Sequence, residues 1–298
     1  MPQSIPAEVA LYACVGAELT QYDVNVEAGT LARRGTVGLP ANLHYAWPHA
    51  SRRFLYVASS DSTPGMGPAG HNHHVTAFRI DPASGALSPH GEPITLPTRP
   101  IHMTTDIPSE QLLVAFSNPS GLRVYRVNHD ATLGDEVPQP EPIDAGIYGH
   151  QVRVSPDDSL AILVTRGHDA AAGKPEEPGA LKVFQYRDGL LTREVSVAPN
   201  GGTASARATL IFIRHGPGSI FRWSGRTSSI CSKSPGARSL PRLRSARRHW
   251  QSRATFAVDK PPVRFTSIRM AVLSTRSTEP PLRSRWMADR SSLAAKTP

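Results

Sequence analysis

Among the residues of this sequence that could do chemistry, histidines in two places stand out. His150 directly follows the turn-like run 146–149 and begins an apolar segment that ends at the turn 155–158. Three further histidines lie together in one loop rich in glycine and proline: His71, His73 and His74. A histidine at the start of a strand can act as a general base, because its usual pKa lies close to neutral pH. Three clustered histidines suggest a metal site instead.

The histidine-rich loop, residues 61–74, gives little support for a cofactor. No carboxylate stands at helical spacing from the histidines, so we do not expect a metal site there. The same loop contains GMGPAG over residues 65–70, which matches the GxGxxG pattern of dinucleotide-binding turns. Pro68 and the strand-like segment 75–80 leave no helix whose N-terminus could hold a pyrophosphate. We therefore predict neither a metal nor an organic cofactor.

Two other pairs of residues are interpreted structurally. Asp157 and Asp158 are adjacent, so in an extended chain they point to opposite faces, and they are typical turn residues rather than a carboxylate pair. His44 and Trp47 could stand at the edge of a channel, but packing in a core is the favoured interpretation.

The cysteines and the N-terminal region indicate the compartment. Cys14 and Cys231 lie far apart without metal-ligand spacing, which argues against a disulfide framework or a structural zinc site and fits a reducing environment. Cys14 lies in the apolar run 9–15, where a small buried residue is expected rather than a nucleophile. That run is too short for a transmembrane helix and lacks a preceding basic region. We expect a soluble cytoplasmic protein without a membrane partner.

A repeated pattern of short strands organises residues 1–202. Short apolar runs bounded by turn residues predict an all-β fold. One repeated unit has an aromatic residue, a glycine seven positions later and a leucine nine positions later, and it appears in full at Tyr22 and Phe78. Looser copies surround Tyr125 and Phe184, so the aromatic residues are 56, 47 and 59 positions apart.

A second repeated unit, a polar turn followed by an apolar strand, lies between these copies. It occurs at residues 48–57, 108–114 and 155–164. Periods near 50 residues with several strands per period predict a β-propeller, built from four-stranded blades around a central channel. A β-sandwich is the alternative, but sandwiches lack such an ordered repeat.

These units, together with the phrase IYGHQVRVSPDD over residues 147–158, resemble the lactonase family of seven-bladed propellers. That family includes 6-phosphogluconolactonases and carboxymuconate-cyclising enzymes. The resemblance spans about residues 10–202, which would retain about four of the seven blades. It implies metal-independent hydrolysis of a lactone ring, with a small sugar lactone such as 6-phosphogluconolactone as the substrate. His150 matches the family's catalytic histidine.

The remainder of the chain has a different composition. The whole chain has 33 Lys and Arg against 24 Asp and Glu, a net charge of +9. Residues 1–202 hold 14 basic and 21 acidic residues, a net charge of −7, which leaves 19 basic and 3 acidic residues, or +16, for residues 203–298. That second segment also contains 16 Arg and 16 Ser, a bias that predicts disorder rather than a packed domain.

A change of reading frame near Gly202 accounts for this composition. Suppose that each original codon was the last base of one present codon plus the first two bases of the next. Residues 203–214 then permit YGFGPRHLDFHP, and residues 262–275 permit AGTIHIHPNGRFVY. Both strings resemble segments that follow in the lactonase family. We therefore predict that residues 1–202 form an incomplete propeller and that residues 203–298 are out-of-frame translation.

The frame change affects the site that the resemblance implies. The family's other site residues, an arginine, a carboxylate and a further basic residue, map into the shifted segment. The recovered arginine corresponds to the codon now read as Ala208, so Arg207 and Arg214 are not its counterparts. A base without oxyanion and anion-binding partners is an incomplete site, so we expect impaired activity and poor folding in this chain.

Two functions outside enzymology stay open. The propeller could serve as a non-catalytic binding module, or the basic segment could bind nucleic acid through phosphate contacts. Arginines such as those within residues 242–248 show no regular spacing, no RG repeats and no recurrent aromatic residues. For the basic segment we therefore predict only nonspecific binding of polyanions.

Overall fold

The computed structural model describes residues 9–62, 68–170 and 173–198, together with four strands at 210–214, 219–224, 229–233 and 272–275. Every regular element in these ranges is a β-strand, as the sequence predicts. Neighbouring strands are antiparallel, and they form four sheets that correspond to propeller blades, followed by one three-stranded sheet. In the described part of the chain no helix could cross a membrane.

Each blade has its strands in chain order from the inner edge outward, apart from β20 in blade 1 and β8 in blade 2. Blade 1 contains β20 (Val272–Thr275), β1 (Val9–Val15), β2 (Glu18–Asn25) and β3 (Thr30–Gly38). Blade 2 contains β4 (Asn42–Pro48), β5 (Phe54–Ser60), β6 (His73–Ile80), β7 (Leu87–Pro89) and β8 (Ile94–Thr95), which pairs with β6. Blade 3 contains β9 (Pro100–Thr105), β10 (Gln111–Ser117), β11 (Ser120–Val127) and β12 (Leu133–Glu136). Blade 4 contains β13 (Gly149–Val154), β14 (Leu160–Thr165), β15 (Leu181–Arg187) and β16 (Leu190–Val197).

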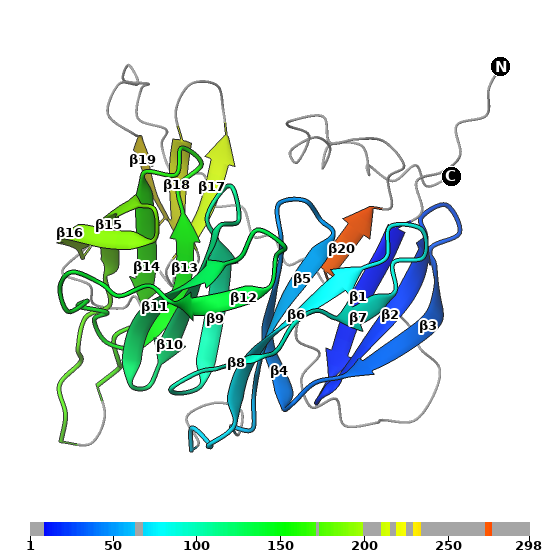
Figure 1. Ribbon diagram of the computed structural model, residues 1–298. Helices are drawn as coiled ribbons and strands as arrows, with labels where there is room; N and C mark the ends of the chain where they lie inside the picture. Colours follow the sequence, from blue (N-terminus) through cyan, green and yellow to red (C-terminus); the bar gives the residue numbers. More distant parts are fainter. Residues whose placement is uncertain are drawn as a thin grey trace, which may run out of the picture.

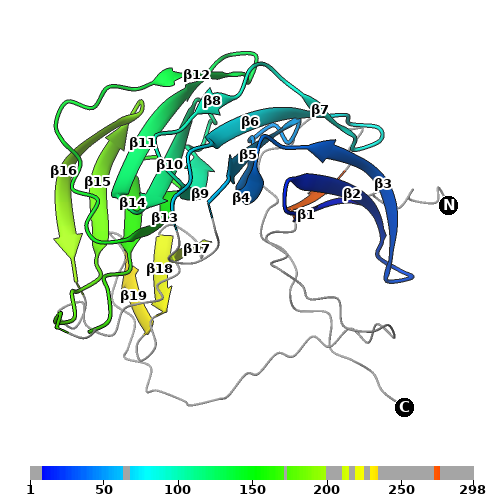
Figure 2. The same cartoon turned by 90° about the horizontal axis from the view of Figure 1, so that it is seen from below.

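The four blades stand side by side in an arc (Figures 1 and 2). In Figure 2 the first strand of each sheet, β20, β4, β9 or β13, lies on the concave side, and β3, β7, β12 and β16 lie on the convex side. Because β20 pairs with β1, it occupies in blade 1 the inner position that β4, β9 and β13 hold in the other blades. Residues from four different blades can therefore meet along one inner edge.

The arginine- and serine-rich segment also contributes the sheet β17 (Leu210–Arg214), β18 (Ser219–Ser224) and β19 (Ser229–Lys233). These strands and β20 are short stretches containing β-branched or aromatic residues, which favour extended structure. The structure describes these four strands within the segment that the sequence predicts to be disordered. The other residues of 203–298, and with them most of the predicted out-of-frame segment, lie outside the described residues.

The predicted repeats coincide with equivalent parts of the blades. The aromatic–glycine–leucine unit forms the third and fourth strands of a blade. In blade 1 these are β2 and β3, because β20 is the innermost strand there. Its glycine takes a left-handed conformation in the connecting turn, with φ of +62° at Gly29, +70° at Gly85 and +84° at Gly189. Residues other than glycine adopt this conformation at a cost, which explains why a glycine recurs in this turn, seven positions after the aromatic residue in blades 1 and 2 and five positions after it in blade 4.

The second repeated unit is the turn between the first and second strands of blades 2, 3 and 4. In each turn one residue has a positive φ and its N–H donates to the carbonyl three positions earlier: Arg52 to His49, Ser109 to Asp106 and Asp158 to Ser155. Asp157 also accepts hydrogen bonds from Ser155 Oγ and Ser159 N. The prediction that Asp157 and Asp158 are turn residues is therefore confirmed. Because the three turns are equivalent, positions on the inner strands β4, β9 and β13 can be compared by counting back from the first residue of each turn.

Three hydrophobic cores hold the blades together, one at each junction between neighbours. Blades 1 and 2 enclose Tyr12, Leu55 and Phe78, blades 2 and 3 enclose Tyr56, Met103 and Phe116, and blades 3 and 4 enclose Leu113, Val152 and Phe184. Cys14 belongs to the first core as a buried free thiol, and burial raises its pKa to about 11. The expectation that Cys14 is a small core residue is therefore confirmed. Because each core needs two blades, a blade is stable only beside its neighbours.

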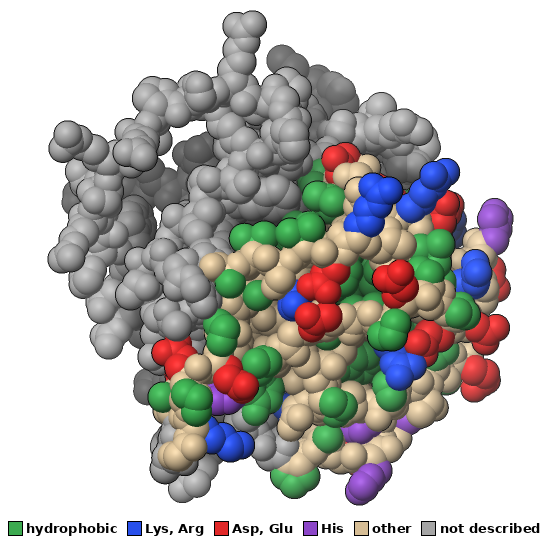
Figure 3. Space-filling view, turned by 90° about the vertical axis from the view of Figure 1, so that its left-hand side faces the viewer, with side chains coloured by type: hydrophobic (Ala, Val, Ile, Leu, Met, Phe, Trp, Pro, Cys, Tyr) green, Lys and Arg blue, Asp and Glu red, His purple; other side chains and the backbone are tan. Residues whose placement is uncertain are grey.

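The outer side of blade 4 is mixed in character. Figure 3, which views the molecule from the left-hand side of Figure 1, shows acidic and hydrophobic side chains intermingled over the described residues. On β15 and β16, Leu181 pairs with Val197 and Val183 pairs with Val195, so these four apolar residues share one region of the sheet. Val195 and Val197 are 58% and 44% exposed, respectively. In the described part of the chain this region has no buried core of its own.

Candidate active site

His150 is the second residue of β13, on the inner edge of the arc, and a tightly built turn sets its position. Gly149 leaves no space for a side chain, because a Cβ there would lie 2.6 Å from the carbonyl oxygen of Phe116 in blade 3. The amide of Gly149 donates to Ser120 Oγ at 2.9 Å, and that hydroxyl donates to the carbonyl of Ala145 at 2.8 Å. Tyr148 adopts a positive φ of 52°. The start of β13 is thus fixed against blade 3.

An ion-pair network around the buried Lys182 holds the same turn from blade 4. Lys182 on β15 donates to Asp144 Oδ2 at 2.5 Å and to Glu194 Oε1 at 2.9 Å. Burial opposes the charge of Lys182, but its hydrogen bonds to the carboxylates of Asp144 and Glu194 outweigh this and raise the pKa of Lys182. Asp144 also accepts from the amide of Gly146 at 2.8 Å. The turn that leads to His150 is therefore supported by both blades 3 and 4.

The environment of His150 favours its neutral form. The side chain is half-buried, and burial lowers its pKa below the usual value, with a smaller contribution in the same direction from the positive charge of Arg166. A neutral imidazole at neutral pH has a free lone pair with which to accept a proton from water. The position and protonation of His150 therefore suit a general base.

Four further side chains meet on the inner strands, and we call them the inner-strand cluster: Tyr45 and Trp47 on β4, His102 on β9 and Arg153 on β13. The ring centres of Tyr45 and His102 are 4.0 Å apart, and those of Trp47 and His102 are 6.3 Å apart. The guanidinium carbon of Arg153 lies 4.5 Å from the ring centre of Trp47, within the range of a cation–π contact. Three blades thus contribute to one cluster.

Sequence reasoning identified Trp47 as a possible channel residue but missed Tyr45, His102 and Arg153. The equivalent turns provide the signal that could have found them. Counting back from the first turn residue of blades 2, 3 and 4, the second position is Trp47, Thr104 or Arg153 and the fourth is Tyr45, His102 or Gln151. Because alternate residues of a strand share a face, these positions form one set. The register between β13 and β14 shifts at residues 149–151, so this alternation does not extend to His150.

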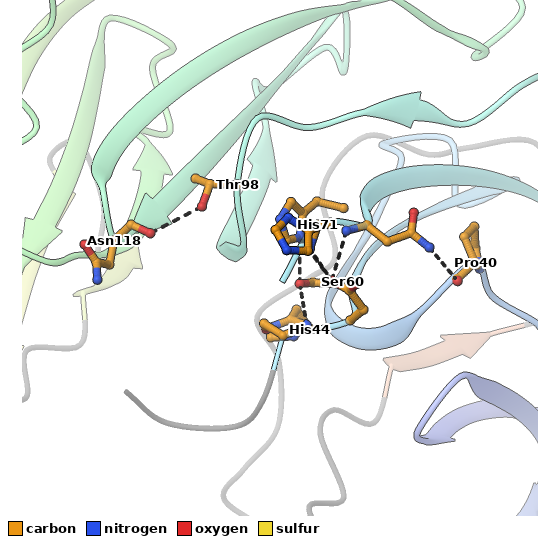
Figure 4. Close-up of polar contacts among 10 residues, drawn as sticks. Pro40, His44, Ser60, His71, Thr98 and Asn118 are labelled. Atoms are coloured by element: carbon orange, nitrogen blue, oxygen red, sulfur yellow. Dashed lines mark hydrogen bonds and ion pairs between the residues drawn. The ribbon is translucent and has the colours of Figure 1, made fainter. Parts of the chain in front are cut away.

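The histidine-rich loop lies between β5 and β6, and its polar groups bond to one another and to residues of β4 and β5 (Figure 4). Ser60 Oγ and His73 Nδ1 are 2.8 Å apart, and Ser62 Oγ and His44 Nε2 are 3.1 Å apart. Asp61 Oδ1 accepts the amides of His71 and Asn72, both at 2.9 Å. These bonds close the loop onto blade 2, and His44 is buried there as a packed residue, as favoured from the sequence.

The structure describes only part of this loop, and what it shows of metal ligands is limited to the described residues. No group of three histidine, cysteine, aspartate or glutamate side chains in those residues could hold a metal ion. Of the GxGxxG motif, residues 65–67 lie outside the described ranges. The described part after the motif continues into β6, which begins at His73 rather than at the predicted Val75. Gly70, at φ +82°, is needed because a Cβ would lie 2.1 Å from Asp61 Oδ1.

An arc of antiparallel blades of four or five strands, with a histidine at the inner edge, defines a β-propeller with a candidate site on its axis side. The family model described as lactonase, 7-bladed beta-propeller, matches residues 9–172. Because this match covers more than half of the sequence, the chain belongs to the lactonase family of seven-bladed propellers. The resemblance seen in the sequence is thereby confirmed.

Comparison with solved structures gives similar folds at low identity. The periplasmic gluconolactonase of Pseudomonas aeruginosa is 15% identical, with a TM-score of 0.44 over 76% of this chain and 81% of that chain. A candidate 6-phosphogluconolactonase of Bacteroides fragilis is 16% identical, with a TM-score of 0.41 over 78% of this chain and 82% of that chain. A protein of Lactobacillus plantarum is 14% identical, with a TM-score of 0.47 over 76% and 66% of the two chains. No curated protein sequence matches this chain.

The predicted partners of His150 are not brought together by the described residues. Ala208, whose codon would contain the recovered arginine, and Arg207 lie outside those residues. Arg214 lies in β17, and its side chain is not described. Arg153, on the inner strand β13, is a described cation that could bind an anionic group of a substrate.

Proposed function

We propose that the fold of this chain is that of a hydrolase of small sugar lactones, such as 6-phosphogluconolactone, with His150 as the general base. The observation that carries this proposal is a half-buried, neutral histidine at the inner edge of a lactonase-family propeller. His150 would take a proton from water as the water oxygen attacks the lactone carbonyl. The ring carbon–oxygen bond then breaks, and the ring oxygen receives a proton, which yields an open-chain hydroxy acid.

We also propose that residues 203–298 are read out of frame, so that this chain lacks part of its propeller and is impaired as an enzyme. The exposed Val195 and Val197 of β16, which pair with the partly buried Val183 and Leu181 of β15, support this idea, because a further blade packed on blade 4 would cover them. The family's additional site residues would then be encoded in the other frame. Restoring that frame would supply groups that stabilise the tetrahedral oxyanion.

Lactone hydrolysis by the frame-restored chain tests the proposed activity. Proton release from glucono-δ-lactone and from 6-phosphogluconolactone would be followed with the spontaneous rate subtracted. Removing a general base typically costs 10²- to 10⁴-fold in rate, so we expect His150→Asn to lower kcat/KM by about that factor. His129→Asn, at an exposed loop position, is the matched control and should leave the rate unchanged.

The pH profile gives a second readout. Because burial lowers the pKa of His150, kcat/KM should reach its plateau below the usual histidine pKa of 6.5 and fall only in more acidic solution. Full activity in His150→Asn, or a restored chain that hydrolyses neither lactone above the spontaneous rate, would reject the proposed function.

A further inference from the structure

Arg153 is held at the inner edge without an acidic partner among the described residues. Its guanidinium lies against the ring of Trp47, and its Nε is buried without a hydrogen-bond partner. By contrast, the arginines for which the structure describes ion pairs lie away from the inner strands, as in Arg34 with Asp23 and Arg123 with Glu136. The side chain as a whole is only partly buried, so an anion could reach the guanidinium. A half-buried cation in this state offers several unused donors to an incoming anion.

His102 provides an independent observation that points to a ligand at the same place. It is only 5% exposed, and both of its ring nitrogens are buried without a hydrogen-bond partner. Burial, with smaller contributions from the positive charges of Arg153 and His150, lowers the pKa of His102 well below its usual value. A neutral imidazole retains one donor and one acceptor, and leaving both unused in a buried place is unfavourable. A polar ligand between Arg153 and His102 would satisfy them.

The aromatic rings shape the rest of this place. The rings of Tyr45 and Trp47 are nearly parallel, with an interplanar angle of 16° and ring centres 6.5 Å apart. Aromatic faces of this kind pack against the C–H groups of a sugar, and Trp47 also holds the guanidinium of Arg153 in one orientation. Both side chains are only partly buried. The cluster therefore combines a fixed cation, an unsatisfied neutral imidazole and two aromatic surfaces.

The distance between Arg153 and His150 along β13 limits the length of the ligand that both residues could contact. The two residues are three positions apart on β13, which corresponds to about 10 Å along an extended strand. His102 is close enough to both for each to affect its pKa. A ligand whose carbonyl carbon lies at His150 would therefore direct its far end toward Arg153. A sugar acid derivative with its anionic group distant from the carbonyl fits this order.

We propose that Arg153, oriented by Trp47 and assisted by His102, binds the carboxylate or phosphate group of a small sugar acid or its lactone. This inference rests on the proposed function for the identity of the ligand as a sugar derivative. Anion binding by the cluster can be measured without any turnover.

The chain offers a matched control for a cation–π contact that only supports the fold. Arg79 also lies over an aromatic ring, with its guanidinium carbon 5.4 Å from the ring centre of Phe54, but it stands on β6, away from the inner edge. If Arg153 were only a packing partner of Trp47, Arg153→Met and Arg79→Met would have comparable consequences. If Arg153 binds an anion, only Arg153→Met weakens ligand binding.

Binding to the full chain would be measured by calorimetry and by the rise in melting temperature, with four probes. 6-Phosphogluconate carries both anionic groups, gluconate carries a carboxylate only, inorganic phosphate carries no sugar, and sorbitol carries no charge. We expect 6-phosphogluconate to bind and sorbitol not to bind. Arg153-dependent binding of gluconate would identify the carboxylate as the bound group, and Arg153-dependent binding of inorganic phosphate would identify the phosphate. Arg153→Met loses a charge-assisted hydrogen bond, so its affinity for 6-phosphogluconate should fall on the order of 10- to 100-fold. Arg153→Lys keeps the charge and should retain part of the affinity.

His102→Phe keeps an aromatic ring but removes both unsatisfied nitrogens. We expect it to leave the melting temperature of the free chain unchanged or higher and to weaken 6-phosphogluconate binding, a combination that a purely structural role would not give. The inference is wrong if no anion binds to the unmodified chain, if Arg153→Met binds as the unmodified chain does, or if Arg79→Met loses as much affinity. Arg153-dependent binding in a frame-restored chain that hydrolyses no lactone would reject the proposed function alone.

Discussion

The hydroxyl of Tyr186 on β15 donates a hydrogen bond of 3.2 Å to Oδ2 of Asp106, in the turn between β9 and β10. This contact joins blades 3 and 4 at a buried position. The other oxygen of Asp106, Oδ1, accepts the amides of Glu110 and Gln111 at 2.8 and 3.0 Å. Burial raises the pKa of Asp106 from 3.8 to about 6, and the negative charge of Asp158 acts in the same direction. The blade junction therefore contains a carboxyl group that resists ionisation.

The raised pKa of Asp106 predicts a specific dependence of stability on pH. Between about pH 4 and pH 6 the folded chain holds this proton more strongly than the unfolded chain, so its contribution to stability is lost as pH rises through about 6. Asp106→Asn keeps an oxygen for the two amides and cannot ionise. We expect this variant to lose that part of the pH dependence and to be at least as stable at pH 7, measured by thermal melts from pH 4 to pH 8.

The exposed Asp188, whose side chain is 85% accessible, supplies the control for that measurement. Asp188→Asn should leave the pH dependence unchanged. A variant Asp106→Asn that is clearly less stable at pH 7, with the original slope retained, would contradict the role assigned to Asp106.

Lys182 is predicted to position His150 from a distance. Its amine holds Asp144, which in turn holds the amide of Gly146 in the turn before β13. Lys182→Met keeps most of the packing volume and removes two charge-assisted hydrogen bonds, so we expect a loss of about 1–3 kcal/mol in unfolding free energy. Lactonase activity of the frame-restored variant should fall through kcat rather than KM, because the base and not the ligand site is displaced.

The exposed Lys174 offers a comparison, and Lys174→Met should change neither stability nor kcat. If Lys182→Met lowers stability but leaves kcat and its pH profile unchanged, Lys182 is a structural residue only.

Gly149 should be intolerant of any side chain. A Cβ at this position would meet the carbonyl oxygen of Phe116 at 2.6 Å, and that atom belongs to the backbone of a neighbouring blade, which cannot move alone. We expect Gly149→Ala to destabilise the chain by about 1–3 kcal/mol, as overpacked sites do, and to displace His150. Gly35→Ala, where no atom lies within 4 Å of the added Cβ, is the control, and equal melting temperatures for the two variants would contradict this account.

The sequence predicts the blades well because each blade repeats local chemistry. Gly85 and Gly189 mark left-handed turns, and the buried aromatic residues Phe78 and Phe184 mark the strands before them, so the order of units is visible without any long-range information. His150 is a candidate in the sequence because a turn and a strand flank it directly and because it matches a histidine of the family.

The rest of the site depends on contacts between blades, which a local pattern does not contain. Arg153 meets Trp47 across more than 100 residues of sequence, and His102 has no unusual local neighbours. Their common position becomes visible only when the inner strands are aligned from the three equivalent turns. The pairing of β20 with β1 is likewise a contact between the two ends of the described chain, which spacing within a blade could not predict.

The proposed frame change makes a prediction about both nucleic acid and protein. Translating the other frames downstream of codon 202 should yield a sequence that continues the propeller, beginning close to YGFGPRHLDFHP. The restored chain would cover the apolar residues of β15 and β16 with a further blade, so it should be soluble and unfold in one cooperative transition. The present chain, with those residues exposed, should aggregate on heating.

Nucleotide sequencing across codon 202, followed by thermal melts and light scattering of both chains, checks this prediction at two levels. A continued propeller in another frame, together with a higher melting temperature for the restored chain, is the expected result, because each added blade junction buries a new apolar core. If no other frame continues the propeller, or if the present chain is monomeric and unfolds cooperatively over its whole length, then residues 203–298 are a genuine part of the protein and the frame proposal is wrong.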